Sequence, residues 1–335
     1  MKTFRNLFPQ IISFENVYAA YRKARKGKRY KEYTLSFSDD IESELFSIID
    51  DLKTGTYAPG AYHTFMVYEP KERMICAAPF RDRVVHHAIC NVVEPLFDRT
   101  FIDDSYACRK GKGTHRALFR SWEFMRERRY VLKCDIRKYF TSIDHEVLKR
   151  ILQRKIACDD TLRLIDTIID HGNEVSPVHG KGLPIGNLTS QFFANIYLNE
   201  LDMFAKHELK AKRYVRYMDD FIIFHDDKLF LHQCKHRIRS FLSNLKLELK
   251  PGKSEIIPIQ NGFEFLGFFN KPDKIRVKKE SVKRFTRRLR ELRWKYGNGE
   301  TSISKIGESV RSWCAHATYA DSVHLKRDIL RGFTV

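Results

Sequence analysis

Apolar residues recur along the chain with two different spacings, and these spacings predict two kinds of element. A repeat of three to four residues, typical of a helix with one buried face, runs through residues 10–55 and includes Val17, Ala20 and Tyr21. A second helix within this region is expected over Ile41–Leu52. The same repeat predicts further helices over residues 83–97, 113–128, 189–204 and 228–245. The chain is therefore expected to be rich in helix.

Shorter segments alternate between apolar and polar residues, which is the pattern of strands. Two strands are expected over residues 62–68 and 74–77, joined by a turn at Glu69-Pro70-Lys71. Residues Tyr130–Ile136 alternate in the same way. Asp135 is therefore expected near the end of a strand.

The second half of the chain adds the remaining strands. A tight hairpin is expected over residues 213–224, with its tip at Met218 and Asp219, and further strands over 247–249 and 263–269. Strands that are paired by hairpins and interleaved with helices indicate an α+β fold rather than a doubly wound sheet.

The charge of the chain changes this picture from a generic fold to a protein with a polyanionic partner. It has 61 Lys and Arg against 42 Asp and Glu, a net charge of +19, while 43% of its residues are hydrophobic. It can therefore bury a core, and a disordered basic tail is excluded. Residues 271–295 carry twelve Lys and Arg against three Asp and Glu, a local net charge of +9. Nucleic acid is the expected partner of such a surface.

Other classes find less support in the sequence. Apolar runs such as Phe221–Phe224 are far shorter than the ~20 residues that a membrane span needs, and no secretory signal is visible, so a cytoplasmic protein is expected. The seven cysteines are scattered without a C-x-x-C pair, which favours reduced core residues. His232 and His236 have a spacing that can clamp a metal on a helix, but no further ligand cluster accompanies them.

Three aspartates form the strongest candidate for chemistry. Asp135 is expected at a strand end, and Asp219 and Asp220 at a hairpin tip, where the turn allows adjacent carboxylates to converge. Two unit charges about 4 Å apart repel by roughly 4 kcal/mol at an effective dielectric of about 20, unless cations offset the repulsion. Oxygen ligands favour Mg²⁺ over zinc, and a pair of such ions serves phosphoryl transfer. The alternative is ordinary solvated turn chemistry.

Several ordered blocks of residues resemble the motifs of reverse transcriptases. Tyr217-Met218-Asp219-Asp220 is similar to their catalytic hairpin, and Lys133–Phe140 with Ile143-Asp144-His145 to their first palm motif. The other blocks are Glu69–Arg73 and Asp82-Arg83 of the fingers, Leu183–Gln191 of the second palm motif, Lys250–Lys253, and Phe265–Phe268 of the primer grip. The resemblance implies a right-hand polymerase with fingers, palm and a short helical thumb. It also implies RNA-directed DNA polymerase activity, with template RNA, a primer or cDNA strand and deoxynucleoside triphosphates as partners.

The same resemblance implies roles for the carboxylates. Asp135 and Asp219 match the principal metal ligands, and Asp220 matches the third carboxylate near the primer terminus. The Ile136 carbonyl matches a backbone ligand. The implied cofactor is a pair of Mg²⁺ ions, with Mn²⁺ as a substitute.

Further residues match a nucleotide-binding set. Lys71 and Arg73 fall where fingers side chains hold the incoming triphosphate. A lysine ammonium and a planar arginine guanidinium are both suited to binding phosphate. Phe140 matches the aromatic residue that lies under the sugar and rejects a 2′-hydroxyl. Lys253 matches the lysine that protonates pyrophosphate. Two alternatives stay open: Tyr139 exchanges roles with Phe140, or Lys253 is a solvated loop lysine. The implied primer grip consists of Phe265, Leu266 and Gly267.

The second palm motif indicates a subfamily. Most reverse transcriptases that resemble this chain carry Gln-Gly and Ser-Pro where it has Ile185-Gly186 and Ser190-Gln191. This pattern is similar to that of diversity-generating retroelements, which copy a template-repeat RNA with errors at adenines and rewrite a target gene. Ile185 and Gln191 would both contact the nucleotide, and Ile185 lacks an amide that could hydrogen-bond near the templating pair. Reduced discrimination is expected, unless Ile185 only packs the palm.

The subfamily resemblance adds one partner and leaves alternatives. The partner is a basic accessory variability protein that forms a ring. One alternative is another bacterial reverse transcriptase, of intron, retron or phage-defence type, and another is a non-catalytic RNA-binding protein with a polymerase fold. The implied domains are a helical extension over 1–55, fingers over 56–130 with a contribution from 150–182, the palm over 131–270 and a basic thumb over 271–335.

Overall fold

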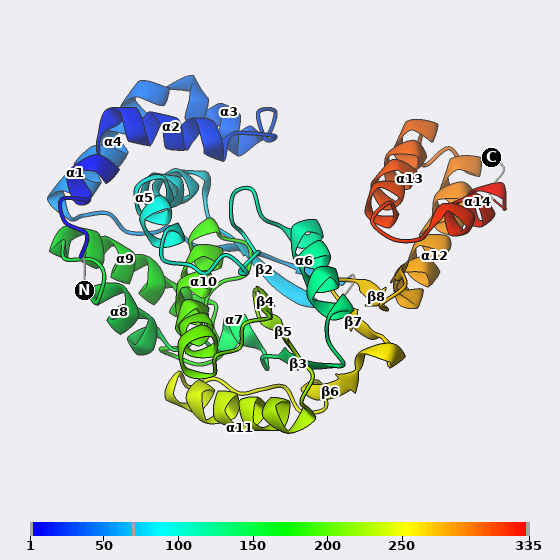
Figure 1. Cartoon of the computed structure of the whole chain (residues 1–335). Helices are drawn as coiled ribbons and strands as arrows, with labels where there is room; N and C mark the ends of the chain where they lie inside the picture. Colours follow the sequence, from blue (N-terminus) through cyan, green and yellow to red (C-terminus); the bar gives the residue numbers. More distant parts are fainter. Residues whose placement is uncertain (1–2, 69–70, 333–335) are drawn as a thin grey trace.

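The computed structural model of the chain describes residues 3–68 and 71–332. It consists of helices and three antiparallel sheets, so the α+β prediction is confirmed. The N-terminal and C-terminal helices lie at opposite ends of the molecule, with the largest sheet between them (Figure 1). Glu69 and Pro70 of the predicted fingers turn lie outside the described residues.

The N-terminal region is helical, as its periodicity predicts. Its helices are α1 (Phe8–Ile11), α2 (Phe14–Ala24), α3 (Glu32–Asp39) and α4 (Ile41–Thr54). Ser13 caps α2, because its hydroxyl accepts a hydrogen bond from the Asn16 backbone N–H at 3.3 Å. The Asn16 side chain donates to the Ala88 carbonyl of α5 (Phe80–Asp98) at 3.0 Å. These helices are thereby fixed to the body of the molecule through α5.

The predicted fingers hairpin is present as a separate two-stranded sheet. Strands β1 (His63–Val67) and β2 (Arg73–Ala77) pair in antiparallel register, with Phe65 opposite Ile75. Every residue of β1 is exposed, and β2 is exposed at its start and buried near Cys76. The hairpin is therefore anchored at one end only.

The central sheet has four antiparallel strands. Across the sheet these are β4 (Tyr214–Tyr217), β5 (Asp220–His225), β3 (Tyr130–Asp135) and β6 (Glu255–Pro258). Leu132 and Ile223 belong to one buried cluster and Val131 and Ile222 to another, because alternate residues of a strand face opposite sides. Both faces are covered by helices, so the strands are apolar on both sides.

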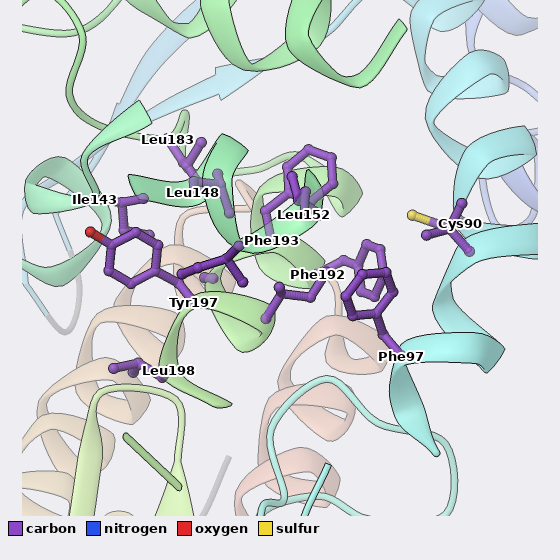
Figure 2. Close-up of a cluster of buried hydrophobic side chains, with 14 of the residues drawn as sticks. Cys90, Phe97, Ile143, Leu148, Leu152, Leu183, Phe192, Phe193, Tyr197 and Leu198 are labelled. Carbon is purple, nitrogen blue, oxygen red and sulfur yellow. The ribbon is translucent and has the colours of Figure 1, made fainter. Parts of the chain in front are cut away.

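Different helices cover the two faces of this sheet. One face packs against helices that include α10 (Leu188–Met203) and α11 (Lys228–Asn244), and the other against α6 (Thr114–Arg126). Figure 2 shows the buried cluster that joins α10 to α5, with Phe192 of α10 near Phe97 of α5. Phe97 and Phe192 meet edge to face, with ring centroids 5.8 Å apart. This cluster fixes α10 in the centre of the molecule.

The C-terminal region is a second unit of sheet and helix. Its strands are β7 (Phe263–Phe265), β8 (Phe268–Asn270) and β9 (Ile275–Val277), and its helices are α12 (Lys279–Gly297), α13 (Ile303–Ala317) and α14 (Val323–Arg331). The rings of Phe285 in α12 and Trp313 in α13 stack in parallel, 4.3 Å apart. Leu118 of α6 belongs to the same buried cluster, so this unit is packed against the rest of the chain.

Some strand predictions were wrong. Residues 247–249 form no strand, and Leu249 makes only an isolated bridge to Ile136. The single strand expected over 263–269 is divided into β7 and β8 by a turn at Leu266 and Gly267. Strand β6 was not predicted, because its four residues are half exposed at a sheet edge and show little alternation.

The remaining elements are one further pair of packed helices and several short turns. They are α7 (Tyr139–Ser142), α8 (His145–Gln153), α9 (Asp159–His171), the 3₁₀ turns Gly172–Glu174 and Ile259–Asn261, and the π-helical turn Phe204–Glu208. Asp144 caps α8 by accepting a hydrogen bond from the Val147 backbone N–H at 3.1 Å. Among the helices of the described residues, none has the length and apolar character to cross a membrane.

Candidate active site

The three aspartates come together at one end of the central sheet. Asp135 is the last residue of β3 and lies directly opposite Asp220, the first residue of β5. Asp219 precedes it in the hairpin turn, and its carbonyl accepts a hydrogen bond from the Ile136 backbone N–H at 3.3 Å. The sequence-predicted carboxylates are thus neighbours, although they come from segments more than 80 residues apart.

The turn that carries Asp219 has an unusual backbone. Only Met218 and Asp219 connect the paired residues Tyr217 and Asp220, and Met218 has φ = +55°. A two-residue hairpin needs a positive φ, which glycine or asparagine usually supplies. A methionine in this region costs on the order of 1 kcal/mol or more, and the surrounding structure must hold it there.

The surroundings of Asp219 and Asp220 disfavour the charged forms of these two carboxyls. Burial raises the pKa of Asp219, and the nearby Asp135 raises it further, while Arg73 and Lys71 oppose the shift. Burial also raises the pKa of Asp220, to about 7, with Lys133 opposing and Asp135 and Asp219 adding to the increase. A cation at this place would relieve both the burial cost and the mutual repulsion.

The chemistry of these residues fits a hard divalent cation. All of the donors are oxygens, and the buried Oδ1 of Asp220 has no hydrogen-bond partner. The described residues nevertheless contain no preassembled group of three or more His, Cys, Asp or Glu side chains that could hold a metal. Within the described residues, no third His, Cys, Asp or Glu side chain therefore joins His232 and His236 to form a metal site.

The fingers hairpin places its cations towards the carboxylates. Lys71 and Arg73 are exposed, and both lower the pKa of Asp219, so their charges lie within electrostatic range of the catalytic turn. The backbone also links this hairpin to the segment before α10, because the Cys76 N–H donates to the Ile185 carbonyl at 2.8 Å. The positive charges of this hairpin therefore favour the charged form of Asp219.

A lysine that sequence reasoning missed lies against the carboxylates. The Lys250 ammonium is 3.5 Å from the Asp135 carboxylate, and the Lys250 backbone N–H donates to the Asp135 carbonyl at 2.8 Å. The predicted Lys253 is exposed in the same turn, where its N–H donates to the Lys250 carbonyl at 3.2 Å. Both lysines were visible in the Lys-Pro-Gly-Lys motif, but a motif does not show which side chain faces inward.

The two adjacent aromatics differ in their burial. Tyr139 is 2% exposed, and its hydroxyl donates to the Ala194 carbonyl at 2.5 Å, so it is part of the core. Phe140 is only partly buried and packs against the core at its edge. Phe140 is therefore the ring that remains accessible to a bound nucleotide.

The second palm motif joins the fingers to the palm. Gly186 has φ = +124°, and a Cβ there would lie 2.9 Å from Ile75 Cγ2 and 3.2 Å from the Cys76 carbonyl oxygen. Only glycine allows the backbone at this position to lie so close to strand β2. The Ile185 side chain is partly exposed, and Gln191 at the start of α10 accepts a hydrogen bond from the exposed Cys108 thiol at 3.3 Å.

The predicted primer grip is a tight turn between β7 and β8. Phe265 is 1% exposed and belongs to the buried cluster on the α6 side of the central sheet. Leu266 and Gly267 both have positive φ, +53° and +84°, as a two-residue turn of type I′ requires. A Cβ on Gly267 would lie 3.7 Å from the His316 ring, so the turn contacts helix α13.

The fold that carries this site is that of a right-hand polymerase, and comparison with known proteins identifies the family. Residues 68–269 match the family described as "Reverse transcriptase (RNA-dependent DNA polymerase)". The chain belongs to the reverse transcriptase family, and it is an RNA-directed DNA polymerase by class.

Two curated relatives show how far the similarity extends. Protein YkfC of Escherichia coli K12 is 26% identical over 270 residues, which cover 67% of this chain and 70% of that protein. The group II intron-encoded protein LtrA of Lactococcus lactis is 28% identical over 220 residues, which cover 63% of this chain and 37% of that protein. The aligned part of the chain thus corresponds to little more than a third of LtrA. Membership of the family implies that the chain uses a template nucleic acid and deoxynucleotides, but it does not identify the RNA.

Proposed function

We propose that the chain copies a template-repeat RNA into cDNA at the site formed by Asp135, Asp219 and Asp220. The observation that carries this proposal is the convergence of these carboxylates at the end of β3 and β5, beside the cations Lys71 and Arg73. The carboxylates face the primer terminus, and the two cations hold the triphosphate of the incoming nucleotide. Phe140 lies under the sugar.

The cofactor completes this arrangement. Asp135, Asp219, Asp220 and the Ile136 carbonyl would hold two Mg²⁺ ions, for which Mn²⁺ can substitute. When bound, the ions activate the 3′-hydroxyl and stabilise the pyrophosphate leaving group. Lys250 neutralises Asp135 before nucleotide arrives, and Lys253 supplies a proton to pyrophosphate from the solvent side.

Primer extension on an RNA template tests the catalytic site. We expect Asp219→Asn to reduce kcat by on the order of 10³-fold, because it removes a charged ligand from the reacting centre. Asp226→Asn is the matched control, since Asp226 lies just beyond the far end of the same strand, where it pairs with Arg128. Equal activity of the two variants, or full activity of Asp219→Asn, would contradict the proposal.

The thumb supplies a second contact with nucleic acid. Helices α12 and α13 line an open pocket of about 340 Å³. It is lined by Ser281, Arg284, Phe285, Arg288, Ser309, Ser312, Trp313 and His316. Arg284 and Arg288 make no ion pair with another side chain that the structure describes. Two unpaired guanidinium groups with three hydroxyls suit a backbone phosphate, and the neighbouring His316 contacts Gly267 of the primer grip.

Salt dependence tests this contact. Binding of a primed RNA template should weaken steeply between low and physiological ionic strength, because phosphate contacts release counterions. The slope of the logarithm of the binding constant against the logarithm of the salt concentration reports the number of phosphate contacts. The double variant Arg284→Gln with Arg288→Gln should reduce this slope by the amount that corresponds to about two contacts. A flat response in the unmodified chain would contradict a role of the thumb in binding the backbone.

The proposed subfamily rests on the second palm motif. Ile185 and Gln191 stand at the junction of fingers and palm, and the Ile185 side chain is partly exposed there. A branched apolar group near the templating pair offers no hydrogen bond that would select the correct base. We infer that the enzyme is error-prone at template adenines, as in a diversity-generating retroelement.

Sequencing of the cDNA tests this assignment. Ile185→Gln should lower misincorporation at adenines while the other template bases are copied as before. An unchanged error spectrum would favour the second candidate function, that of a group II intron-type reverse transcriptase, which the similarity to LtrA supports.

The accessory partner has a suitable surface at the N-terminal end. Phe14 and Phe46 stack with ring centroids 5.3 Å apart and are 41% and 47% exposed. Two exposed acids, Glu42 and Asp50, lie one helical turn before and after Phe46 in α4. Acidic and aromatic side chains together suit a basic protein, such as the ring-forming accessory variability protein.

A further inference from the structure

A fully buried ion pair lies directly beneath the catalytic turn. Arg216 of β4 and Asp202 of α10 are both 0% exposed. The Arg216 Nε and Nη2 atoms donate to the two carboxylate oxygens of Asp202 at 2.7 and 2.6 Å. Burying both charges is costly, and an apolar pair of similar volume is often as stable. The pair is therefore better explained by the geometry that it fixes than by stability.

The remaining donors of Arg216 reach three further residues. Nη2 also donates to Ser105 Oγ at 2.9 Å, and Nη1 donates to Asn195 Oδ1 and to the Met218 carbonyl, both at 3.2 Å. A guanidinium has five N–H donors, and each of them has an acceptor here. Neither lysine nor an apolar side chain can reproduce this set.

The hydrogen bond from Arg216 to the Met218 carbonyl acts on Asp219, the next residue in the chain and the proposed catalytic carboxylate. The Met218 carbonyl belongs to the peptide group that joins Met218 to Asp219, and Met218 has φ = +55°. Arg216 therefore fixes the peptide plane on one side of Asp219. The Ile136 N–H fixes the other side, because it donates to the Asp219 carbonyl at 3.3 Å.

The anchor beneath Arg216 is itself rigid. Asp202 also accepts a hydrogen bond from the Tyr214 hydroxyl at 2.7 Å, and Asn195 donates to the Ala107 carbonyl at 2.7 Å. The Arg216 backbone N–H donates to the Asp104 carbonyl at 3.0 Å. Helix α10, the segment before α6 and the catalytic hairpin are thus tied together at one side chain.

We propose that Arg216 is a positioning residue for nucleotide transfer. Its side chain is 0% exposed, so it acts through the backbone of the turn rather than on a bound substrate. It holds the Met218–Asp219 peptide in the strained conformation that aims the Asp219 carboxylate at the reacting phosphate. This inference rests on the proposed catalytic role of Asp219.

The test separates positioning from stability. Arg216→Met leaves the Asp202 charge buried without a partner, and this variant should be strongly destabilised. The double variant Arg216→Met with Asp202→Leu should recover the unfolding midpoint, yet its kcat for single-nucleotide addition should fall by about 100-fold, as expected for a misplaced catalytic group. KM for the primed template should stay within about twofold, since no binding residue changes.

Two more variants keep the test decisive. Arg216→Lys retains the charge but cannot reach all of these acceptors, and its kcat should fall by about tenfold with an unchanged KM. Arg81→Met is the control, because it removes an ion pair with Asp51 at 2.5 Å that joins α5 to α4 and includes no residue of the hairpin. Its kcat should equal that of the unmodified chain.

The outcomes are distinguishable. A stable double variant with unchanged kcat would overturn the proposal, and if that variant does not fold, an Arg216→Lys kcat within about twofold of the unmodified value would overturn it. Asp219→Asn is measured in the same assay. Full activity of Asp219→Asn would contradict the proposed function, whereas its inactivity together with normal Arg216 variants would contradict only the role of Arg216.

Discussion

Two hairpins of this chain have similar lengths and opposite surroundings. The fingers hairpin β1–β2 is exposed along the whole of β1, with Phe65 46% and Met66 41% exposed. In the catalytic hairpin β4–β5, Val215 and Phe221 are 0% exposed and helices cover both faces. Burial suits the role proposed for the catalytic hairpin, which is to fix the position of the carboxylates. Exposure suits the role proposed for the fingers hairpin, which is to present charges to a substrate that arrives from solution.

The largest expected difference between the hairpins is in stability. Phe221→Ala should lower the free energy of unfolding by about 3–5 kcal/mol, because it leaves a cavity in the core. Phe65→Ala, its matched partner in the fingers hairpin, should change it by no more than about 0.5 kcal/mol. Urea-induced unfolding measures both values, and equal losses would remove the distinction between the hairpins.

The next effect concerns the exposed hairpin alone. Lys71→Ala with Arg73→Ala should raise KM for the deoxynucleotide by about 10–100-fold, the loss expected for charge-assisted hydrogen bonds, without a change in the unfolding midpoint. Glu72→Ala, between these two residues, is the control and should not raise KM. A fall in kcat with constant KM would instead place these cations in the chemical step.

The smallest effect is a pH dependence that belongs to the catalytic hairpin. The folded-state pKa of Asp220 is about 7, above its usual 3.8, because the carboxyl is buried beside other acids. The protonated group is favoured by folding, so its stabilising effect is complete below about pH 4 and is lost as the pH rises through 7. Without divalent metal, the free energy of unfolding should fall over this range by at least about 1.4 kcal/mol, the equivalent of one pKa unit.

The control for this pH dependence is Asp220→Asn. In this variant the free energy of unfolding should fall less as the pH rises through 7. Added Mg²⁺ should also reduce it, because a bound cation favours the charged carboxylate. Identical pH profiles for the variant and the unmodified chain would show that Asp220 is not the group that titrates.

The sequence predicted the hairpins because each has a local signal. The tip at Met218 and Asp219 lies between two apolar strands, and the helical repeat located α10 and α11 to within a few residues. The turn at Leu266 and Gly267 was missed because apolar residues continue through it. Strand β6 was missed because an edge strand that is half exposed has little pattern to detect.

The contacts within the site could not be predicted in the same way. The choice between Lys250 and Lys253 depends on the path of a turn, and the partners of Arg216 lie 14, 21 and 111 residues away in sequence. An arginine in the middle of a strand gives no sign of whether it faces solvent or a buried carboxylate. Such contacts are defined by the tertiary fold, and only the structure reveals them.

The central claim is that the carboxylates at the end of the catalytic hairpin hold a divalent cation. Fe²⁺ can replace Mg²⁺ at an oxygen site, and with ascorbate and peroxide it cleaves the backbone next to its ligands. Mapping these cuts on the unmodified chain should place them next to Asp135 and at the Asp219–Asp220 turn, and Asp135→Asn with Asp219→Asn should abolish them. Cuts near His232 and His236 instead, or an unchanged pattern in the double variant, would contradict the account.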